Sequence, residues 1–524
     1  MACLKPLTSG EIVDSEVGPL RGAEGVQQRI GGDNSREKST LESYRIALER
    51  DPTLWSTIKD EFCELQERTS LASCFLKAAV PGHAAVYDAV VWQQGRSVIC
   101  ATGDANVYVL GLGSGTGTEL DHRLENEQTT HVRMVLEGHL DMVTTLALSS
   151  DGKQLLTGSL DKTLRVWDLS AVEAGVNGYG ADMVKRGSQD NCSDGNSKPG
   201  LISPVKTLEG HTSRINCLRW TPCGAMAISS STDSTLRLWD TKSGVCLHEM
   251  RGHGSLVSSI DLSIDGKVCA SASGDAVCKL WGIPCGPGSG NSEDGGTPTR
   301  GELIADIAWE SGPVVLCQFV AFEQHGEYLV TAHAQLVQQQ ARILLWDVFD
   351  KETGWVDGRL RAPCYAIDDL RGCPTCIDTT RVQGGDFAGT ELLACACSDG
   401  KVHVWDISEC PVKLATYSLE EPGHSIPEDV PAWSVSHLRH ASNKLNMVSF
   451  SPSGTYLAAT RSQSSSIVVW EVDEGEEACQ FYGHKKPIRK LIWVSDYKLV
   501  SISEDGTVRG WSVPDPVRAV DPRI

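Results

Sequence analysis

Long apolar runs and an excess of positive charge are both missing from this sequence of 524 residues. No stretch has the roughly 18–20 uninterrupted apolar residues that a membrane-spanning helix needs, and the opening MACLKPLTSGEIVDSE lacks the apolar core of a secretory signal. Acidic residues outnumber basic ones by 68 to 47, and the formal net charge of −21 opposes the phosphate neutralisation on which nucleic-acid affinity depends. We therefore expect a soluble protein of the cytoplasm, the nucleus or both, with no membrane span and no general affinity for nucleic acid.

The composition is otherwise typical of a folded protein. Apolar residues make up 40% and charged residues 22% of the chain, which argues against a mainly disordered protein. The 19 cysteines are an odd number, but they are scattered and many lie inside apolar runs, where a free cysteine behaves as a small hydrophobe. We expect reduced core thiols rather than a disulfide framework.

One order of residues recurs along the chain: Gly-His, an apolar run, a turn, a second apolar run rich in Ser or Ala, Asp, and a strand ending in Trp. Four strong copies occupy residues 136–168, 208–240, 250–282 and 481–512. Four weaker copies occupy 80–110, 314–347, 373–406 and 445–471. Each copy alternates β-branched and polar residues over short runs separated by Gly, Asp or Ser turns, which predicts antiparallel strands rather than helices.

These segments, among them LEGHLDMVTTLALSSDGKQLLTGSLDKTLRVWD at 136–168, resemble the WD-repeat family. The resemblance implies an all-β propeller of four-stranded blades, which we place at residues 70–515. Eight copies predict eight blades; seven is the alternative, because Leu110 stands where the first copy should have Trp. Repeats of the family are offset from their blades, which implies that strand 74–80 completes the last blade and closes the ring.

The sequence predicts three segments outside the propeller. Residues 1–36 are rich in Gly and charge and are expected to be a flexible tail, while residues 516–524 form a C-terminal tail. Residues 37–69 carry apolar side chains at helical spacing, such as Trp55 and Ile58, and predict a short amphipathic helical arm. We expect the arm to pack on the propeller; a dimerisation or partner-binding stripe is the alternative.

Insertions rich in Gly and Ser occupy residues 111–131, 170–203 and 283–300, each between the predicted third and fourth strands of a blade. In the family this connection lies on the face opposite the Gly-His turns. We expect inert polar loops that crowd that face and leave the Gly-His face comparatively bare.

The recurring His, Ser or Thr, Asp and Trp match a buried hydrogen-bond relay of the WD-repeat family, and the resemblance implies the same structural role here. The four complete sets are His139, Thr157, Asp161 and Trp167; His211, Ser229, Asp233 and Trp239; His253, Ser271, Asp275 and Trp281; and His484, Ser501, Asp505 and Trp511. A fully paired buried network fixes one local geometry, so a catalytic role is disfavoured. The weaker copies lack members: Cys395 takes the hydroxyl position and 314–347 has no matching His, so we expect those blades to open more easily.

Motifs for catalysis, a cofactor or a metal fail on their spacing. HEMRGH at 248–253 has one residue too many for a zinc-protease helix, and GLGSGTGT at 111–118 has no following Lys to reach phosphates. Four cysteines, Cys373, Cys376, Cys395 and Cys397, offer a zinc site as the alternative to core thiols, but zinc sites favour two C-x-x-C pairs. We expect no enzymatic activity, no cofactor and no metal.

Partner segments commonly bind WD-repeat proteins on the Gly-His face, through side chains three and five residues after the turn His. The resemblance therefore implies eight candidate partner-binding residues: Met142, Thr144, Arg214, Asn216, Leu256, Ser258, Pro487 and Arg489. The two arginines suit an acidic or phosphorylated segment. The alternative is that all eight are ordinary rim residues.

The resulting prediction is a non-enzymatic scaffold that mediates protein–protein interactions in an intracellular multiprotein complex and binds other proteins or peptide segments. The alternative is a substrate receptor of a cullin-type ubiquitin ligase, in which the arm would dock the ligase. Many such receptors carry Trp-Asp-x-Arg after the third strand, whereas this chain has WDLS, WDTK, WGIP, WDVF, WDIS, WEVD and WSVP. None of these fits.

Overall fold

The computed structural model describes residues 74–514, apart from 94, 112–131, 171–199, 285–300, 309–311, 323–325, 335–340, 351–353, 356–357, 361–362, 371, 386, 409–410, 419–446 and 462–464. The predicted segments 1–36, 37–69 and 516–524 lie outside the described residues. Within the described ranges, no helix is long and apolar enough to cross a membrane.

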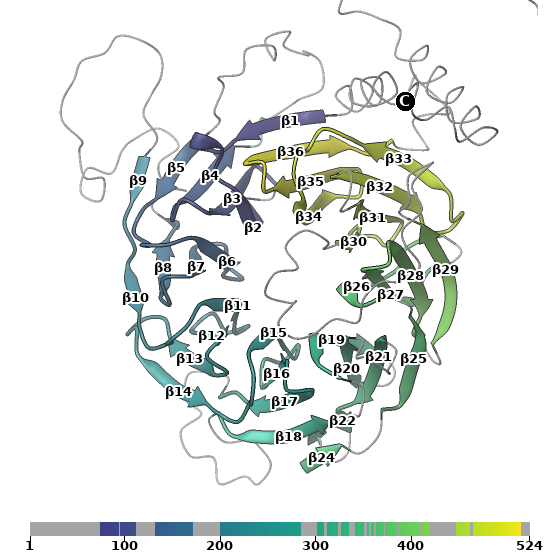
Figure 1. Cartoon of the computed structure of the whole chain (residues 1–524), viewed down its shortest axis with the longest axis horizontal. Helices are drawn as coiled ribbons and strands as arrows, with labels where there is room; N and C mark the ends of the chain where they lie inside the picture. The colour runs from purple at the N-terminus through teal and green to yellow at the C-terminus, as the bar shows by residue number, and fades with distance from the viewer. Residues whose placement is uncertain are drawn as a thin grey trace, which may run out of the picture.

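Eight antiparallel sheets are arranged in a ring around a central axis, as the blades of a propeller (Figure 1). We number the blades 1 to 8 in the chain order of their inner strands. The all-β, eight-bladed architecture predicted from the repeats is confirmed.

The four strands of each blade run from the axis to the rim. Blade 1 consists of β2 (Val86–Trp92), β3 (Ser97–Thr102), β4 (Val107–Gly111) and β5 (Val132–Leu136). Blade 2 consists of β6 (Val143–Leu148), β7 (Gln154–Ser159), β8 (Leu164–Asp168) and β10 (Lys206–Leu208). Blade 3 consists of β11 (Ile215–Trp220), β12 (Met226–Ser231), β13 (Leu236–Asp240) and β14 (Cys246–Met250). Blade 4 consists of β15 (Val257–Leu262), β16 (Val268–Ser273), β17 (Val277–Gly282) and β18 (Leu303–Ala308).

The second half of the ring has the same order. Blade 5 consists of β19 (Val314–Phe322), β20 (Gly326–His333), β21 (Ala341–Asp347) and β25 (Tyr365–Leu370). Blade 6 consists of β26 (Pro374–Arg381), β27 (Glu391–Cys397), β28 (Lys401–Asp406) and β29 (Val412–Ser418). Blade 7 consists of β30 (Val448–Phe450), β31 (Tyr456–Arg461), β32 (Ser466–Glu471) and β33 (Glu477–Phe481). Blade 8 consists of β34 (Ile488–Ser495), β35 (Lys498–Ser503), β36 (Thr507–Ser512) and β1 (Cys74–Ala79).

Strand β1 closes the ring, because it pairs antiparallel with β36 from the other end of the chain, with Leu76 opposite Gly510. In Figure 1 the purple β1 lies along the yellow β36. Pairing with β1 covers the outer edge of β36, which would otherwise be open to pairing with another chain.

Two blades carry a fifth strand that pairs in parallel with the outer strand. Strand β9 (Gly200–Ile202) pairs with β5 of blade 1, and β24 (Gly358–Leu360) pairs with β18 of blade 4. Each fifth strand belongs to the connection between the third and outer strands of the following blade. The insertion at 170–203 is therefore partly structural, whereas the sequence predicted an inert loop. A hairpin of β22 (Phe349–Asp350) and β23 (Gly354–Trp355) belongs to the same connection as β24, and a short 3-10 turn, η2 (Pro81–His83), follows β1.

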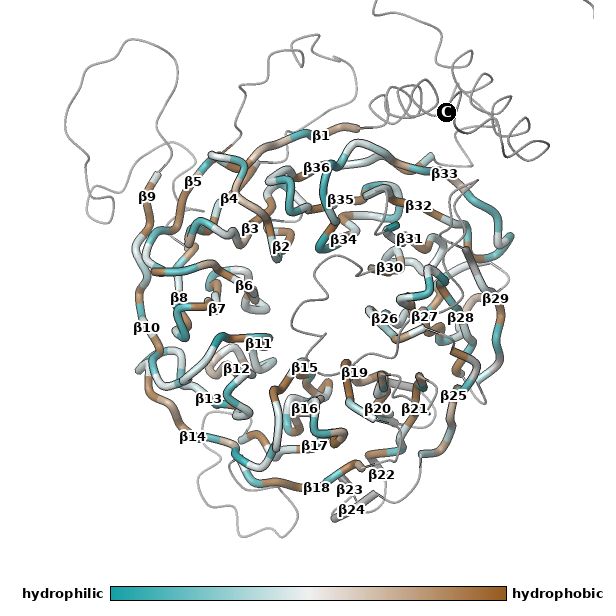
Figure 2. Tube along the Cα trace, viewed as in Figure 1, coloured by the Kyte–Doolittle hydropathy of each residue, from teal (hydrophilic) through white to brown (hydrophobic). Residues whose placement is uncertain are grey.

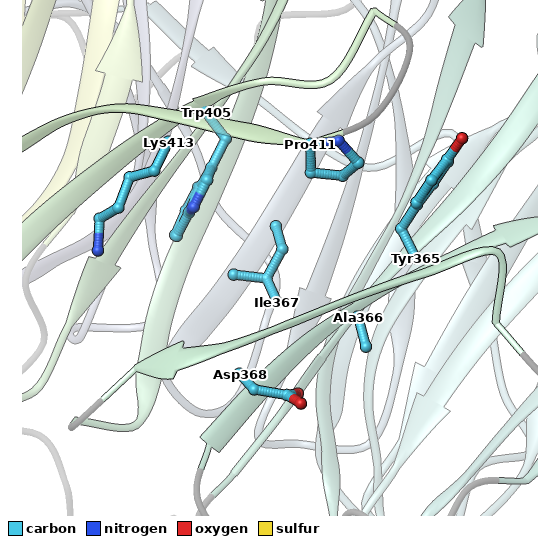
Figure 3. Close-up of a pocket in the computed structure, with 7 residues that line it drawn as sticks. All are labelled: Tyr365, Ala366, Ile367, Asp368, Trp405, Pro411 and Lys413. Atoms are coloured by element: carbon cyan, nitrogen blue, oxygen red, sulfur yellow. The ribbon is translucent and has the colours of Figure 1, made fainter.

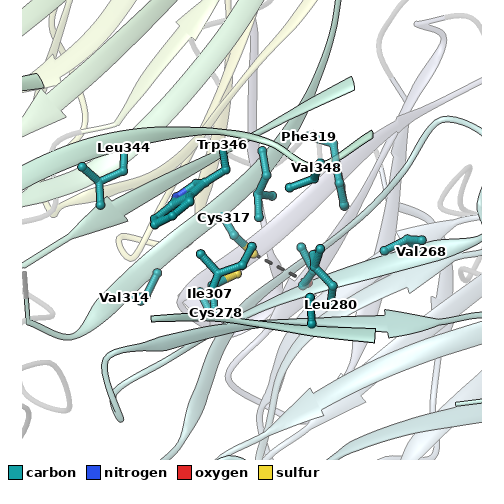
Figure 4. Close-up of a cluster of buried hydrophobic side chains, with 14 residues drawn as sticks. Val268, Cys278, Leu280, Ile307, Val314, Cys317, Phe319, Leu344, Trp346 and Val348 are labelled. Atoms are coloured by element: carbon teal, nitrogen blue, oxygen red, sulfur yellow. Dashed lines mark hydrogen bonds between the residues drawn. The ribbon is translucent and has the colours of Figure 1, made fainter. Parts of the chain in front are cut away.

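Apolar side chains between neighbouring blades form the core, because each sheet buries both of its faces against other sheets. All six residues of second strands β3, β12, β16 and β31 are buried. Between blades 4 and 5, Leu280 and Ile307 pack against Phe319 and Trp346 (Figure 4). Figure 2 shows the hydrophobic residues along the strands and hydrophilic residues at many of the turns.

Long insertions occur in two kinds of connection between strands. The undescribed ranges 112–131, 171–199 and 285–300 each follow a third strand. A further insertion, 419–446, joins outer strand β29 to inner strand β30. That type of connection also carries the Gly-His turns; the expectation of a comparatively bare Gly-His face depends on residues outside the described ranges and stays a prediction.

Candidate functional site

Blades 2, 3, 4 and 8 each bring one His, one hydroxyl, one Asp and one Trp together beneath the Gly-His turn. In blade 2, His139 Nδ1 lies 2.8 Å from Asp161 Oδ2 and His139 Nε2 lies 2.7 Å from Thr157 Oγ1. The Trp167 indole N–H donates to the same hydroxyl over 2.9 Å. The corresponding groups in the other three blades are joined in the same way: His211, Asp233, Ser229 and Trp239; His253, Asp275, Ser271 and Trp281; and His484, Asp505, Ser501 and Trp511.

The glycine before each relay His has a positive φ, and at Gly138, Gly210 and Gly483 a Cβ would also displace an arginine side chain. Gly210 and Gly483 have φ values of 154° and 140°, in the region that side chains other than glycine rarely adopt. A Cβ at Gly483 would overlap the guanidinium of Arg509, which donates to the Gly483 carbonyl over 2.5 Å. Arg509 also lies over Trp511, with 5.9 Å from its Cζ to the ring centroid. The turn, the basic residue of the third strand and the Trp therefore form one packed unit.

The relay carboxylates accept hydrogen bonds from several donors. Asp161 Oδ2 also accepts from the Leu140 N–H at 3.0 Å, and Oδ1 accepts from the Thr163 N–H at 2.8 Å. Burial acts to raise the pKa of Asp161, but the bonds from His139, Leu140 and Thr163 outweigh it and hold that pKa well below its usual range. Burial also lowers the pKa of His139, although Asp161 opposes the shift. The Thr157 hydroxyl is fully buried and already paired with His and Trp, so it offers no nucleophile to a substrate.

Two blades that lack the relay set contain substitutes that the sequence analysis missed. In blade 1 the Tyr108 hydroxyl donates to Asp104 Oδ2 over 2.7 Å, while His83 is exposed. In blade 5 the His333 ring lies 3.0 Å from Thr331 Oγ1, and Trp346 donates to that hydroxyl over 2.8 Å. His333 comes from the end of the second strand rather than from a Gly-His turn. The signals available in the sequence were a Tyr opposite the hydroxyl position and the Thr-Ala-His at the end of the apolar run.

In blade 6, Cys395 occupies the hydroxyl position. Cys395 Sγ lies 3.7 Å from Cys397 Sγ, and both thiols are buried in the core between blades 5 and 6. Burial raises the pKa of Cys376 to about 12. Across the part of the chain that the structure describes, no group of three or more His, Cys, Asp or Glu could hold a metal ion.

The candidate partner-binding residues divide into two kinds. The residues five positions after each turn His lie at β-bulges of inner strands: Thr144, Asn216, Ser258 and Arg489. Three of these side chains donate to a backbone carbonyl of the next blade: Thr144 to Ile215 at 2.8 Å, Asn216 to Val257 at 2.7 Å and Ser258 to Val315 at 2.7 Å. These residues therefore hold adjacent inner strands together.

The fourth bulge residue differs. Arg489 forms an ion pair with Glu504, and its Cζ lies 5.9 Å from the centroid of the Tyr87 ring. Only 15% of its side chain is exposed. Arg489 thus ties blade 8 to blade 1 instead of extending into solvent.

The residues three positions after each turn His lie nearer the surface. Arg214 is exposed, and Met142, Leu256 and Pro487 are half-buried. Leu140, directly after the relay His of blade 2, is 87% exposed.

Comparison with known proteins places this geometry in a known class. Residues 130–168, 202–240, 244–282, 433–471 and 475–512 match the family profile described as WD domain, G-beta repeat. The nuclear distribution protein PAC1 of Arthroderma otae is 28% identical over 178 residues, which are 30% of this chain and 39% of that protein. The WD repeat-containing protein 26 homolog of Arabidopsis thaliana is 22% identical over 386 residues, 71% of this chain and 55% of that protein.

The fold of this chain is also similar to that of a solved structure. The crystal structure of the computationally designed Ika8 protein has a TM-score of 0.51 and 18% identity, and the match covers 83% of this chain and 99% of that chain. The chain spans 39% to 55% of the two curated relatives.

The repeats, the relay and the closed ring define an eight-bladed β-propeller of WD repeats. The chain carries WD repeats in the five segments that the family profile matches.

Proposed function

We propose that this protein is a non-enzymatic scaffold that acts in the cytoplasm, the nucleus or both and binds segments of partner proteins on its Gly-His face. The observation that carries the proposal is the contrast on blades 2 to 4. Thr144, Asn216 and Ser258 are engaged in bonds between blades, whereas Arg214, whose Nε donates to Asn216 Oδ1 over 3.0 Å, is exposed to solvent. A rigid inner ring with accessible side chains above it is a preorganised binding surface, which lowers the entropy lost on association.

The chemistry of the exposed groups favours an apolar partner segment with acidic residues. Leu140, Met142 and Leu256 supply apolar contact area, and Arg214 supplies a guanidinium that suits carboxylates. Lys485 and Lys486 are also exposed beside the relay His of blade 8. In this proposal the four bulge residues, Arg489 among them, position the inner strands, and the residues three positions after each turn His contact the partner.

Arg214→Glu tests the proposal. We expect it to lose partner proteins in affinity capture with mass spectrometry while the melting temperature stays within a few degrees, because an exposed surface substitution usually changes stability by less than about 0.5 kcal/mol. Arg96→Glu is the matched control: Arg96 is exposed in the turn between β2 and β3, on the other face. Retention of the same partners by Arg214→Glu would remove the Gly-His face assignment.

The ligase-receptor alternative stays a prediction that depends on residues 37–69, outside the described ranges. Capture of cullin-ligase components by the full chain would favour it.

A further inference from the structure

The two fifth strands of this propeller occupy the same register on their blades. In blade 1, β9 pairs Gly200, Leu201 and Ile202 with Met134, Val135 and Leu136. In blade 4, β24 pairs Gly358, Arg359 and Leu360 with Ala305, Asp306 and Ile307. Val135 lies opposite Tyr108, and Asp306 lies opposite Lys279. Tyr108 and Lys279 occupy the same position in the third strands of their blades. The propeller therefore has a repeated docking position for a short parallel strand at the outer edge of a blade.

The equivalent position in blade 5 is the edge formed by Tyr365, Ala366 and Ile367. Ala366 lies opposite Leu344, the counterpart of Lys279 in blade 4. Among the described residues no strand pairs with the outer edge of β25. A cleft of about 480 Å³ is found at this edge instead.

Residues of two blades line the cleft between them. Tyr365, Ala366, Ile367 and Asp368 come from β25 of blade 5, whereas Trp405, Pro411 and Lys413 come from blade 6 (Figure 3). Lys413 Nζ lies 5.8 Å from the centroid of the Trp405 ring. Asp368 is held in place by Arg342, whose Nε lies 3.0 Å from its carboxylate.

The length of one connection explains why no described segment of this chain fills the cleft as β9 and β24 fill the other two positions. The connection that contains β9 runs from residue 169 to 205, and the one that contains β24 runs from 348 to 364. The corresponding connection of blade 6 is only residues 407–411. Five residues that must turn from β28 into β29 leave no segment that can extend along β25.

The strand already docked in blade 1 indicates the chemistry of an occupant. Ile202 packs against the apolar cluster that contains Trp167 of blade 2, and Trp405 is the residue of blade 6 that corresponds to Trp167. The Ile202 carbonyl accepts from the Glu137 N–H over 3.1 Å. Both fifth strands begin with Gly and have a branched apolar residue at the third position.

We propose that the cleft between blades 5 and 6 binds an extended segment of another protein with the pattern Gly-x-Ile or Gly-x-Leu, as a fifth strand parallel to β25. Main-chain hydrogen bonds to the edge of β25 provide the affinity, and the pocket at Trp405 selects the third residue, as in β-strand addition generally. This surface lies on the rim of the propeller and is independent of the Gly-His face.

A labelled peptide provides the test. The probe is Lys-Pro-Gly-Leu-Ile-Ser-Pro-Val, the sequence of residues 198–205, added to the full chain and followed by fluorescence anisotropy. We expect saturable binding, and at least about tenfold weaker binding to Ala366→Trp, whose indole obstructs the exposed edge position. Leu414→Trp is the matched control, because Leu414 is 36% exposed on β29 but does not line the cleft. It should bind as the unaltered protein does.

A second substitution is made in the peptide, so it cannot alter the fold of the protein. The peptide with Ile202→Gly should lose at least about tenfold in affinity, because it lacks the apolar side chain that fills the pocket at Trp405. Equal affinity of the two peptides, equal affinity for Ala366→Trp, or no binding of the original peptide would each overturn the proposal. Arg214→Glu should leave the peptide affinity unchanged, so failure here is distinguishable from failure of the Gly-His face proposal.

A photo-crosslinking residue at position 366 identifies the occupant. Crosslinks to the added peptide support the proposal. Crosslinks within one chain would assign the cleft to a segment of this protein, and a crosslinked dimer would assign it to a second copy; either result overturns binding of another protein.

Discussion

Removal of the relay carboxylate of blade 3 by Asp233→Ala should destabilise the protein by about 1–3 kcal/mol, the cost of leaving a buried polar group without its partner. Asp233 accepts from His211 at 2.8 Å, from the Thr212 N–H at 2.9 Å, and from the N–H and hydroxyl of Thr235 at 3.0 and 2.6 Å. His211 is only 6% exposed, so water cannot fully replace the lost acceptor. Thr212 is exposed and its N–H can bind water, which keeps the estimate below the sum of four bonds.

The assay is urea denaturation followed by circular dichroism, with hydrogen exchange of residues 208–240 as the local measure. Glu209→Ala is the matched control, since Glu209 is an exposed acid two residues from His211; its effect should stay within about 0.5 kcal/mol. Equal stability of Asp233→Ala and the unaltered protein would refute the structural role of the relay.

Lowering the pH should reduce the difference in the free energy of unfolding between the unaltered protein and Asp233→Ala. Burial acts to raise the pKa of Asp233, but the bonds from His211, Thr235 and Thr212 outweigh it and hold that pKa well below its usual range. The stability that this carboxylate contributes is therefore present above the ordinary carboxyl pKa of about 4 and lost as the pH falls through the lowered native value. A stability difference that grows as the pH falls would contradict this prediction.

Two further predictions concern blades outside the complete sets. Burial, followed by the charge of Arg342, lowers the pKa of His333 to about 4, while the Gly312 carbonyl opposes the shift. Below the ordinary histidine pKa of about 6.5, the native state therefore binds fewer protons than the unfolded state. Lowering the pH from 7 to about 4.5 should reduce the free energy of unfolding by about 2 kcal/mol more in the unaltered protein than in His333→Gln. Urea denaturation at the two pH values measures this, and parallel pH profiles would exclude it. Blade 6, with Cys395 at the hydroxyl position, should exchange its amide hydrogens faster over 373–406 than blade 2 does over 137–168. The reverse order, measured by mass spectrometry, would show that the relay does not determine local opening.

The sequence by itself determined the strands, their grouping into blades and the number of blades. Alternating apolar residues and turn residues act over a few neighbouring positions, and eight copies of one pattern fold into eight copies of one sheet. The grouping of His139, Thr157, Asp161 and Trp167 was also visible, because the resemblance to a family supplied their arrangement.

Only the tertiary structure decided which other residues complete the polar networks and which surfaces stay open. Tyr108 and His333 reach their partners from positions outside the repeated pattern. Residues far apart in sequence, such as Arg489 and Tyr87, meet only because the ring closes and blade 8 lies against blade 1. The cleft at β25 depends on a connection too short to cover it. The contact between Arg489 and Tyr87 and the cleft at β25 depend on how separate blades meet, which local sequence patterns do not encode.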